Sequence, residues 1–486
     1  MTFYGSVPNK HHHLLTKAER DLLQADRPGY GSRTRLEVAF NLVNATVGAG
    51  IIGLPFAVAH AGFFLGVAAS IFVAILSQTG LYMLIVAGQR VGIYKFALLV
   101  EYLLGRPGYH FLNLMIFIQA GGAAVSYFIL LGDTVTVLCQ RYLPQFSILS
   151  DRSIIVPIIG LCCILPLTTS RSIGSLARWS TVAVFTLPVI LLSILIRAPA
   201  YAPDTHIPLT WFGSDIFGAL GIMAFAFTCS QVAFNNYLTL EDQTAHSWRQ
   251  TTTISSGISW LASMTFAIIG FLCFGENVQS NLFMNFAPDD PVVNIGRLAL
   301  GLNMVLSIPV AFFPTREAVQ KSLGFETATK QPTTFQHYIV TIVLFVILLI
   351  TGVTVKSLGK VYALVGGVSA TTLAFILPAC AYLVTRRRTA TSTDVSVYPT
   401  LTASTAVSPM DEDKSPLVFS DVASFASSSR TPIFDEEDVS TVDNYEMLDD
   451  DELPEPSFWL DIAAGLLIVW GFMVMVFSTS GVLTQS

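Results

Sequence analysis

Three glycines and a proline stand in the middle of an apolar stretch near the start of the chain. Residues 41–55 read NLVNATVGAGIIGLP and include Gly48, Gly50, Gly53 and Pro55. Glycine inside a helix costs about 1 kcal/mol relative to alanine, and proline suits the start of a helix. The pattern therefore predicts a discontinuous membrane helix whose second half begins near Pro55. The N–H groups freed at such a break, together with the helix dipole, can bind a substrate carboxylate. The alternative is close packing of helices through small residues.

A weaker interruption is expected about five membrane spans later. Residues 218–232 are apolar until a polar run at 228–231, and no glycine or proline accompanies that run. Paired breaks in two halves of a chain are typical of a transporter binding site, where freed carbonyls of the second break would hold an ammonium group. The substrate-binding residues predicted from the two breaks are Val47, Gly48, Ala49, Gly50, Ile51, Thr228, Cys229 and Ser230.

Three further polar residues could serve a coupling ion. Asn303 and Ser307 are four residues apart and share a helix face, and their amide and hydroxyl oxygens suit a small cation. Hydrogen bonding between helices is the alternative for this pair. Asp133, near the outer end of the third predicted span, is a candidate for proton coupling because ionisable residues within spans are costly. It could equally be an interfacial carboxylate that is wetted from the lumen.

One enzymatic interpretation is excluded by its context, and a second is disfavoured. Gly48, Gly50 and Gly53 match the GxGxxG dinucleotide fingerprint, but that motif needs a soluble strand-turn-helix unit and an acidic residue about 20 positions later. No Asp or Glu occurs between Glu37 and Glu101. No predicted span carries a His/Cys/Asp ligand cluster or a nucleophile beside a base, so a membrane enzyme is the least favoured class.

The composition indicates which elements must position these residues. The chain has 486 residues, of which 52% are hydrophobic and 12% are charged. A soluble domain has about 25% charged residues, so the composition indicates an all-α polytopic membrane protein and excludes a disordered or nucleic-acid-binding chain. A span needs about 20 apolar residues. Eleven segments qualify: 36–60, 63–88, 108–138, 153–170, 178–197, 212–240, 251–275, 292–314, 336–355, 357–384 and 457–480.

The basic residues set the expected orientation. With the N-terminus in the cytosol, 20 of the 26 Lys and Arg residues fall on the cytosolic side, as the positive-inside rule requires. The expected organisation is a cytosolic tail (1–35), a core of ten spans (36–384), a cytosolic loop (385–456) and an eleventh helix (457–480) whose C-terminus is lumenal or extracellular. Residues 389–456 hold 16 acidic and two basic residues, which more than accounts for the net charge of −7. We expect this loop to be disordered and to act as a tether, or alternatively as a regulatory segment for kinases or trafficking adaptors.

Four stretches of the sequence carry a family resemblance. They are FNLVNATVGAGIIGLPFAVAHAGF at 40–63, LED at 240–242 followed by Trp248, IPVAFFPTRE at 308–317 and SATTLAFILPACAYL at 369–383. Together they resemble the amino acid/auxin permease family, close to its sodium-coupled neutral amino acid transporters and fungal vacuolar amino acid transporters. The resemblance implies a leucine-transporter-type core of five plus five inverted spans with one extra helix, the first and sixth spans being broken.

The same resemblance implies roles for particular residues. The substrate carboxylate is expected on the backbone around Gly48, Ala49 and Gly50, and a cation is expected between Asn44 and Ser307. One departure concerns the sixth span, where relatives often place a histidine after the cysteine. Here Ser230 and Gln231 follow Cys229, so recognition of the substrate side chain is expected to differ.

These observations favour a secondary active amino acid transporter that works by alternating access and is coupled to H⁺ or Na⁺. The expected partners are a small amino acid and the lipid bilayer, with no nucleic acid, no cofactor beyond the coupling ion and no metal beyond Na⁺. A vacuolar or lysosomal-type membrane is favoured over the plasma membrane. The alternative is a receptor of the same fold that senses amino acids and signals through its cytosolic segments.

Overall fold

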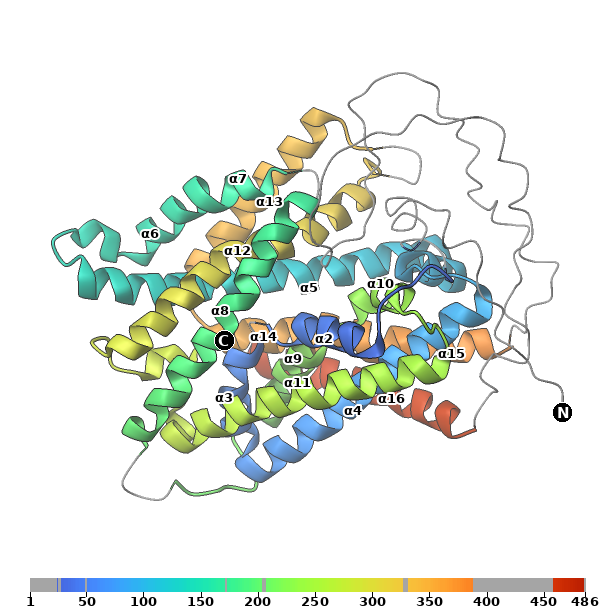
Figure 1. Ribbon diagram of the computed structural model, residues 1–486, viewed down its shortest axis with the longest axis horizontal. Coiled ribbons are helices and arrows are strands. Elements are labelled where there is room, and N and C mark those ends of the chain that lie inside the picture. Colours follow the sequence, from blue (N-terminus) through green and yellow to red (C-terminus); the bar gives the residue numbers. More distant parts are fainter. Residues whose placement is uncertain are drawn as a thin grey trace.

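Every regular element of the described chain is a helix, as Figure 1 shows. The structure is a computed structural model and describes residues 24, 28–48, 50–170, 173–202, 207–326, 331–387 and 458–484, apart from the side chains of 147, 173–184, 387 and 483. Most of the predicted tail 1–35 and nearly all of the predicted loop 385–456 lie outside these residues.

The helices follow one another along the chain with short connections. The α-helices are α2 (Arg35–Thr46), α3 (Gly50–Ala61), α4 (Phe63–Val91), α5 (Phe96–Tyr142), α6 (Arg152–Ile159), α7 (Leu165–Thr168), α8 (Ile173–Tyr201), α9 (Ile216–Phe227), α10 (Ala233–Thr239), α11 (Ala245–Phe274), α12 (Pro291–Ser322), α13 (Thr334–Thr354), α14 (Leu358–Val365), α15 (Leu377–Arg387) and α16 (Phe458–Thr484). Short 3₁₀ turns include η4 (Ser230–Val232) and η6 (Leu282–Asn285), and π-helical turns include η3 (Gly160–Ile164), η7 (Gly366–Ala370) and η8 (Thr372–Ile376).

The described helices confirm an all-helical polytopic membrane protein. Eight of them are long and apolar enough to cross a membrane, or nine if α2 and α3 together form one span. Two shorter apolar segments, Arg152–Thr168 and Phe185–Tyr201, lie where the fourth and fifth spans are predicted. The first of these contains the π-helical turn η3. The count of eleven spans therefore stays a prediction.

The first predicted span changes direction where its glycines lie. Helix α2 ends at Thr46 and α3 begins at Gly50, and the axes of the two helices differ by 66°. Ala49, between them, lies outside the described residues. The prediction that the second helix begins near Pro55 is wrong, because Pro55 is the sixth residue of α3. Gly270 of α11 makes room for the proline ring there, since a Cβ on Gly270 would lie 2.9 Å from the Pro55 side chain.

The polar run in the sixth predicted span lies outside any α-helix. Helix α9 ends at Phe227, and Thr228 adopts an extended conformation (φ −86°, ψ 123°). The turn η4 and helix α10 follow. Thr228 turns its hydroxyl back to the carbonyl oxygen of Ala224 at 2.6 Å, which is a local bond that competes with helix continuation.

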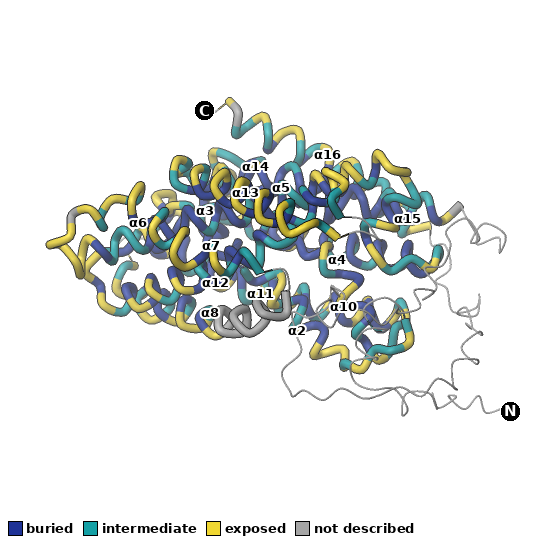
Figure 2. The backbone as a smooth tube through the Cα atoms, turned by 90° about the horizontal axis from the view of Figure 1, so that it is seen from above, coloured by how far each residue is buried: buried dark blue, intermediate teal, exposed yellow. Residues whose placement is uncertain are grey.

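Burial separates the inner helices from the outer ones (Figure 2). In the segment Leu358–Arg386, 83% of the most apolar stretch is buried, against 22% in Phe458–Val482 of α16. Helix α16 packs on α9, α14 and α15 and leaves the rest of its apolar surface exposed. Since a membrane surrounds such a surface with lipid, this placement fits a helix added to the outside of the core.

The chain before α2 forms a clasp with the connection between α10 and α11. The N–H groups of Ser32 and Arg33 both donate to the carbonyl oxygen of Thr239, at 3.1 and 2.9 Å. Arg33 also forms the isolated β-bridge with Leu240. Arg35, the first residue of α2, makes an ion pair with Asp242 at 2.8 Å.

Candidate functional site

The break between α2 and α3 opens onto a small cavity. The cavity has a volume of about 20 Å³ and is lined by residues from three parts of the chain: Val47, Gly48, Ile51 and Ile52 at the break, Leu187, Ile190 and Leu191 of α8, and Leu300, Asn303 and Met304 of α12. Only Asn303 brings a polar side chain to this lining. The structure therefore gathers Val47, Gly48, Ile51 and Asn303 from the predicted site around one space, which we call the apolar cavity.

The two interpretations of the glycines apply to different glycines. A Cβ on Gly50 would lie 2.8 Å from the Cα of Ala226 in α9, and a Cβ on Gly53 would lie 2.9 Å from the ring of Tyr362. These two glycines allow close packing. A Cβ on Gly48 would meet nothing within 4 Å, so packing does not explain the glycine at that position.

The predicted cation ligands are only partly brought together. Ser307 donates to the amide oxygen of Asn303 at 3.1 Å, and the amide nitrogen of Asn303 donates to Thr186 of α8 at 2.7 Å. Asn44 lies on an exposed part of α2 and does not line the apolar cavity. Asn303 thus makes the hydrogen bond between helices that was the alternative, whereas the bond of Ser307 stays within α12.

The polar residues of the sixth span are buried beside the break. Thr228, Cys229 and Ser230 are 6%, 4% and 0% exposed. The hydroxyl of Ser230 has no hydrogen-bond partner among the described residues. Because α9 packs on α3 through Gly50 and Ala226, the C-terminal end of α9 lies close to the N-terminal end of α3.

Asp133 of α5 is paired with Arg152 of α6. The two side chains meet at 2.6 Å and are 14% and 16% exposed. Asn281 donates to the other carboxylate oxygen at 3.1 Å, and Arg152 donates onward to the carbonyl oxygen of Gly352 at 2.9 Å. The carboxylate therefore belongs to a contact that joins α5, α6, α13 and the segment before η6.

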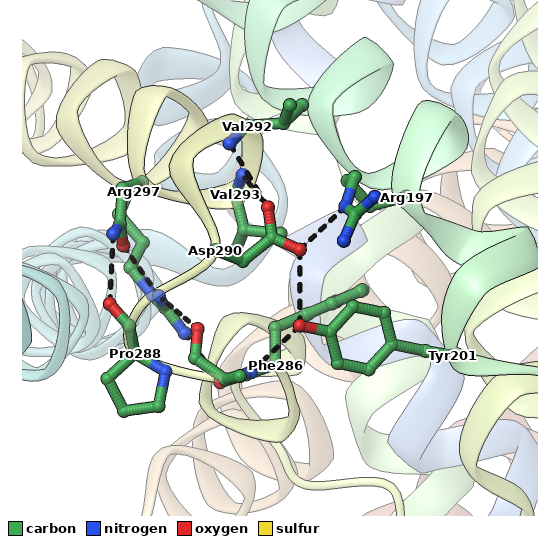
Figure 3. A network of polar contacts seen from close by, with 10 residues as sticks. Arg197, Tyr201, Phe286, Pro288, Asp290, Val292, Val293 and Arg297 are labelled. Carbon is green, nitrogen blue, oxygen red and sulfur yellow. Dashed lines mark hydrogen bonds and ion pairs between the residues drawn. The ribbon is translucent and has the colours of Figure 1, made fainter.

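A second polar network joins α8 to the start of α12 (Figure 3). Asp290 accepts from Arg197 at 2.6 Å and from Tyr201 at 3.1 Å, and it caps α12 by accepting from the N–H of Val293. Arg297 is 1% exposed. Its guanidinium donates to the carbonyl oxygens of Phe283, Phe286 and Ala287 and to the amide oxygen of Asn294.

The sequence alone does not identify this network, because most of the groups that pair with its basic residues are main-chain oxygens. Arg297 lies inside the predicted span 292–314. An arginine at such a position is itself a signal, because a charge within a span is retained only with partners.

The sequence of this chain is similar to the sequences of known transporters. Residues 31–407 match the family described as transmembrane amino acid transporter protein. The sodium-coupled neutral amino acid transporter 11 of Bos taurus is 31% identical over 75% of this chain and 79% of its own length. The vacuolar amino acid transporter 2 of Saccharomyces cerevisiae is 26% identical over 71% of this chain and 75% of its own length.

Two solved transporters share the fold at low sequence identity. A nucleobase-cation-symport-1 family transporter in a closed conformation, with bromovinylhydantoin bound, matches with a TM-score of 0.51 and 14% identity, over 76% of this chain and 83% of that one. A manganese transporter mutant of Eremococcus coleocola matches with a TM-score of 0.50 and 12% identity, over 92% of this chain and 87% of that one.

The family match confirms the resemblance read from residues 40–63, 240–248, 308–317 and 369–383, and the relatives are transporters rather than enzymes. The relatives do not support the receptor alternative. The match to the family covers well over half of the chain. The chain therefore belongs to the transmembrane amino acid transporter protein family.

Proposed function

We propose that this protein is a secondary active transporter that carries a small amino acid across a membrane by alternating access. The observation that carries the proposal is the interrupted backbone at 46–50, where α2 stops, α3 starts at an angle of 66° and Gly48 faces open space. Within a membrane, such an interruption is tolerated where it lines a cavity or is buried in protein.

The ends of two helices would supply the substrate contacts. The first N–H groups of an α-helix have no partner within the helix and attract anions, so the start of α3 at Gly50 and Ile51 would bind the carboxylate. The last carbonyl groups of a helix attract cations, so the ammonium group would lie at the end of α9, near Thr228. The close packing of Gly50 against Ala226 supports this arrangement because it brings the two helix ends together.

Coupling would use the interface between the first and eighth spans. Asn44, Asn303 and Ser307 are the candidates for Na⁺. The names of the relatives, one sodium-coupled and one vacuolar, leave both Na⁺ and H⁺ as coupling ions. For H⁺ the candidate is Asp133, which would have to separate from Arg152 as it takes up a proton.

The membrane in which the protein lies is proposed from the names of the relatives. The vacuolar relative favours a vacuolar or lysosomal-type membrane, with the N-terminal tail and the 385–456 loop in the cytosol. We propose that this loop acts as a tether between the tenth and eleventh spans.

Gly48 offers the sharpest test of the site. Replacement Gly48→Val should place a side chain in the space at the break, because a Cβ there meets nothing within 4 Å. In proteoliposomes we expect amino acid uptake to fall at least tenfold. The measurement is uptake of a panel of radiolabelled amino acids, with a pH gradient and a sodium gradient imposed separately.

Gly465 of α16 gives the matched control. A Cβ on Gly465 also meets nothing within 4 Å, and α16 lies outside the two breaks. Gly465→Val should therefore transport as the unaltered protein does. Full uptake by a correctly folded Gly48→Val protein would refute the proposed binding site, and absence of uptake by the unaltered protein under either gradient would refute the transport proposal.

A further inference from the structure

A cluster of arginine and tyrosine side chains lies at the end of α4 that is predicted to be cytosolic. Helix α4 packs on both α11 and α15. The guanidinium carbon of Arg90, in the last turn of α4, lies 4.6 Å from the centre of the Tyr382 ring of α15. Tyr82, about two turns earlier on α4, interacts electrostatically with Arg90 and with Arg249 of α11. We call Tyr82, Arg90, Arg249 and Tyr382 the arginine cluster.

Within the described part of the chain, the two positive charges of the arginine cluster have no counter-charge. Neither Arg90 nor Arg249 makes an ion pair with a residue that the structure describes. Arg90 is partly buried, and the Tyr382 ring on which it stacks is fully buried. A charge that is withdrawn from water needs a partner in a folded protein, so the expected partner is an anion.

Two buried hydrogen-bond donors of the arginine cluster indicate what kind of anion this is. The Nη2 atom of Arg90 and the hydroxyl of Tyr382 have no hydrogen-bond partner among the described residues. Buried polar atoms are rarely left without a partner. A water molecule would satisfy these donors but not the charge. A phosphate group satisfies both, because arginine binds phosphate through two parallel hydrogen bonds.

The arginine cluster lies on the sides of α4 and α11 that face lipid. Tyr82 follows Ile75 by seven residues, which places both on one face of α4, and Ile75 is 52% exposed. Arg249, Thr253 and Gly257 are all exposed and follow one another at intervals of one turn on α11. Within a membrane, these exposed faces would contact acyl chains.

The neighbouring helix ends place the arginine cluster at the depth of the lipid headgroups. Arg386, one turn after Tyr382 on α15, is paired with Asp461 of α16. Phe458 and Trp459, just before this aspartate, are 68% and 77% exposed. Aromatic residues of this kind gather where the membrane meets water, so the ends of α15 and α16 lie at that boundary.

We propose that the arginine cluster binds the phosphate of an anionic phospholipid from the cytosolic leaflet. The phosphate would accept hydrogen bonds from Arg90, Arg249 and Tyr382, and the acyl chains would lie along the exposed faces of α4 and α11. Basic sites between membrane helices recognise lipid headgroups in this way. A choline headgroup would bring its own cation beside two arginines, so a zwitterionic lipid should bind less tightly. Lipid binding does not depend on the proposed transport.

The test is native mass spectrometry of the purified, delipidated full-length protein in detergent. The protein is titrated with dioleoyl phosphatidylinositol, whose one charge is on its phosphate, or with dioleoyl phosphatidylcholine. We expect phosphatidylinositol to bind about tenfold more tightly than phosphatidylcholine. Arg90→Gln and Arg249→Gln should each weaken the binding of phosphatidylinositol by about fivefold and leave that of phosphatidylcholine unchanged. Arg249 is exposed, so its replacement tests the site even if Arg90→Gln does not fold.

Arg141 supplies a matched control for the loss of charge. It is exposed at the far end of α5, which begins just after α4 and is 47 residues long. Arg141→Gln should therefore bind phosphatidylinositol as the unaltered protein does. Tyr382→Phe retains the ring beneath Arg90 and removes only the hydroxyl, and it should weaken the binding by about threefold.

Three outcomes would overturn the proposal: equal binding of the two lipids, unchanged phosphatidylinositol binding in Arg249→Gln, or equal weakening in Arg141→Gln. The soluble headgroup glycerophosphoinositol distinguishes a lipid from a free phosphate compound. We expect no displacement of the lipid by an equal concentration of this headgroup, because the headgroup lacks acyl chains. Displacement at equal concentration would assign the arginine cluster to a soluble phosphate compound and refute the lipid site.

Discussion

Arg297 shows how a buried charge can be held by the backbone. Its guanidinium meets three carbonyl oxygens from 283–287 and the amide of Asn294, and these contacts fix the connection between α11 and α12. The sequence could place this arginine inside a predicted span. It could not supply the acceptors, because they are main-chain oxygens that any sequence carries.

We expect Arg297→Met to destabilise the protein by at least about 2 kcal/mol, because it leaves several buried acceptors without donors and each such group costs about 1–3 kcal/mol. Thermal unfolding monitored by size-exclusion chromatography measures the effect. Arg141, which is exposed at the end of α5, is the control, and Arg141→Met should unfold as the unaltered protein does. Equal stability of the two variants would contradict the role given to Arg297.

Asp290 gives a prediction for pH dependence. Burial alone would raise the pKa of Asp290, but hydrogen bonds from Arg197, from the N–H of Val293 and from Tyr201 outweigh it and hold that pKa below the usual value. A carboxyl group whose pKa is lower in the folded state stabilises the fold above its unfolded pKa, which is about 3.9 for Asp. This stabilisation is lost as the pH falls through the folded pKa.

The Asp290→Asn protein should therefore unfold at a lower temperature than the unaltered protein near pH 7, and the difference should shrink below about pH 4. Melting temperatures between pH 3 and 7 test this. Asp289→Asn, at the exposed neighbouring position, should change the melting temperature little at any pH. If the melting temperature of Asp290→Asn is lower by the same amount at every pH, then the charge of Asp290 does not stabilise the fold.

At the scale of elements, the interruption of the first span could be predicted because glycine is unfavourable in the interior of a helix. The start of α3 could not, because Pro55 is accommodated by Gly270, which is more than 200 residues away in the chain. The placement of Asn44 outside the apolar cavity likewise depends on the 66° angle between α2 and α3. No local sequence pattern encodes that angle.

The packing of α3 on α9 should be sensitive to a single methyl group at Gly50. A Cβ there would lie 2.8 Å from the backbone of Ala226, and overpacking of this kind costs typically about 1–3 kcal/mol. Gly50→Ala should therefore lower the thermal stability, whereas Gly48→Ala, which meets nothing, should not. Equal melting temperatures of the two variants would show that α3 and α9 do not pack as described.

For the whole molecule, the composition predicts a polytopic membrane protein and the basic residues predict its orientation. The relatives establish that the chain is a membrane transporter, and its orientation stays a prediction. Helix α5 makes the orientation testable. The helix is kinked at Gly105, and Arg106 and Arg141 are exposed near the two ends of the part that follows the kink, 35 residues apart. A helix of that length spans about 50 Å, which exceeds the roughly 30 Å of the membrane interior.

Single cysteines at these two positions should react from opposite sides. In sealed, right-side-out vesicles, an impermeant thiol reagent should label Arg141→Cys, and Arg106→Cys should react only after permeabilisation. Cys162 and Cys163, which are exposed, are replaced by alanine beforehand. Labelling of Arg106→Cys in intact vesicles would reverse the predicted orientation.

The clasp before α2 has a consequence for motion. Main-chain bonds from Ser32 and Arg33, and the ion pair from Arg35, fasten the start of α2 to the residues that follow α10. Gly31 permits this contact, since a Cβ there would lie 1.7 Å from the carbonyl oxygen of Leu240. Helix α2 therefore cannot swing outward alone: it must take the α10 connection with it or first release the clasp. Helices α2 and α10 are thereby coupled, and the strength of the contact between residues 32–35 and residues 239–242 sets how readily they separate.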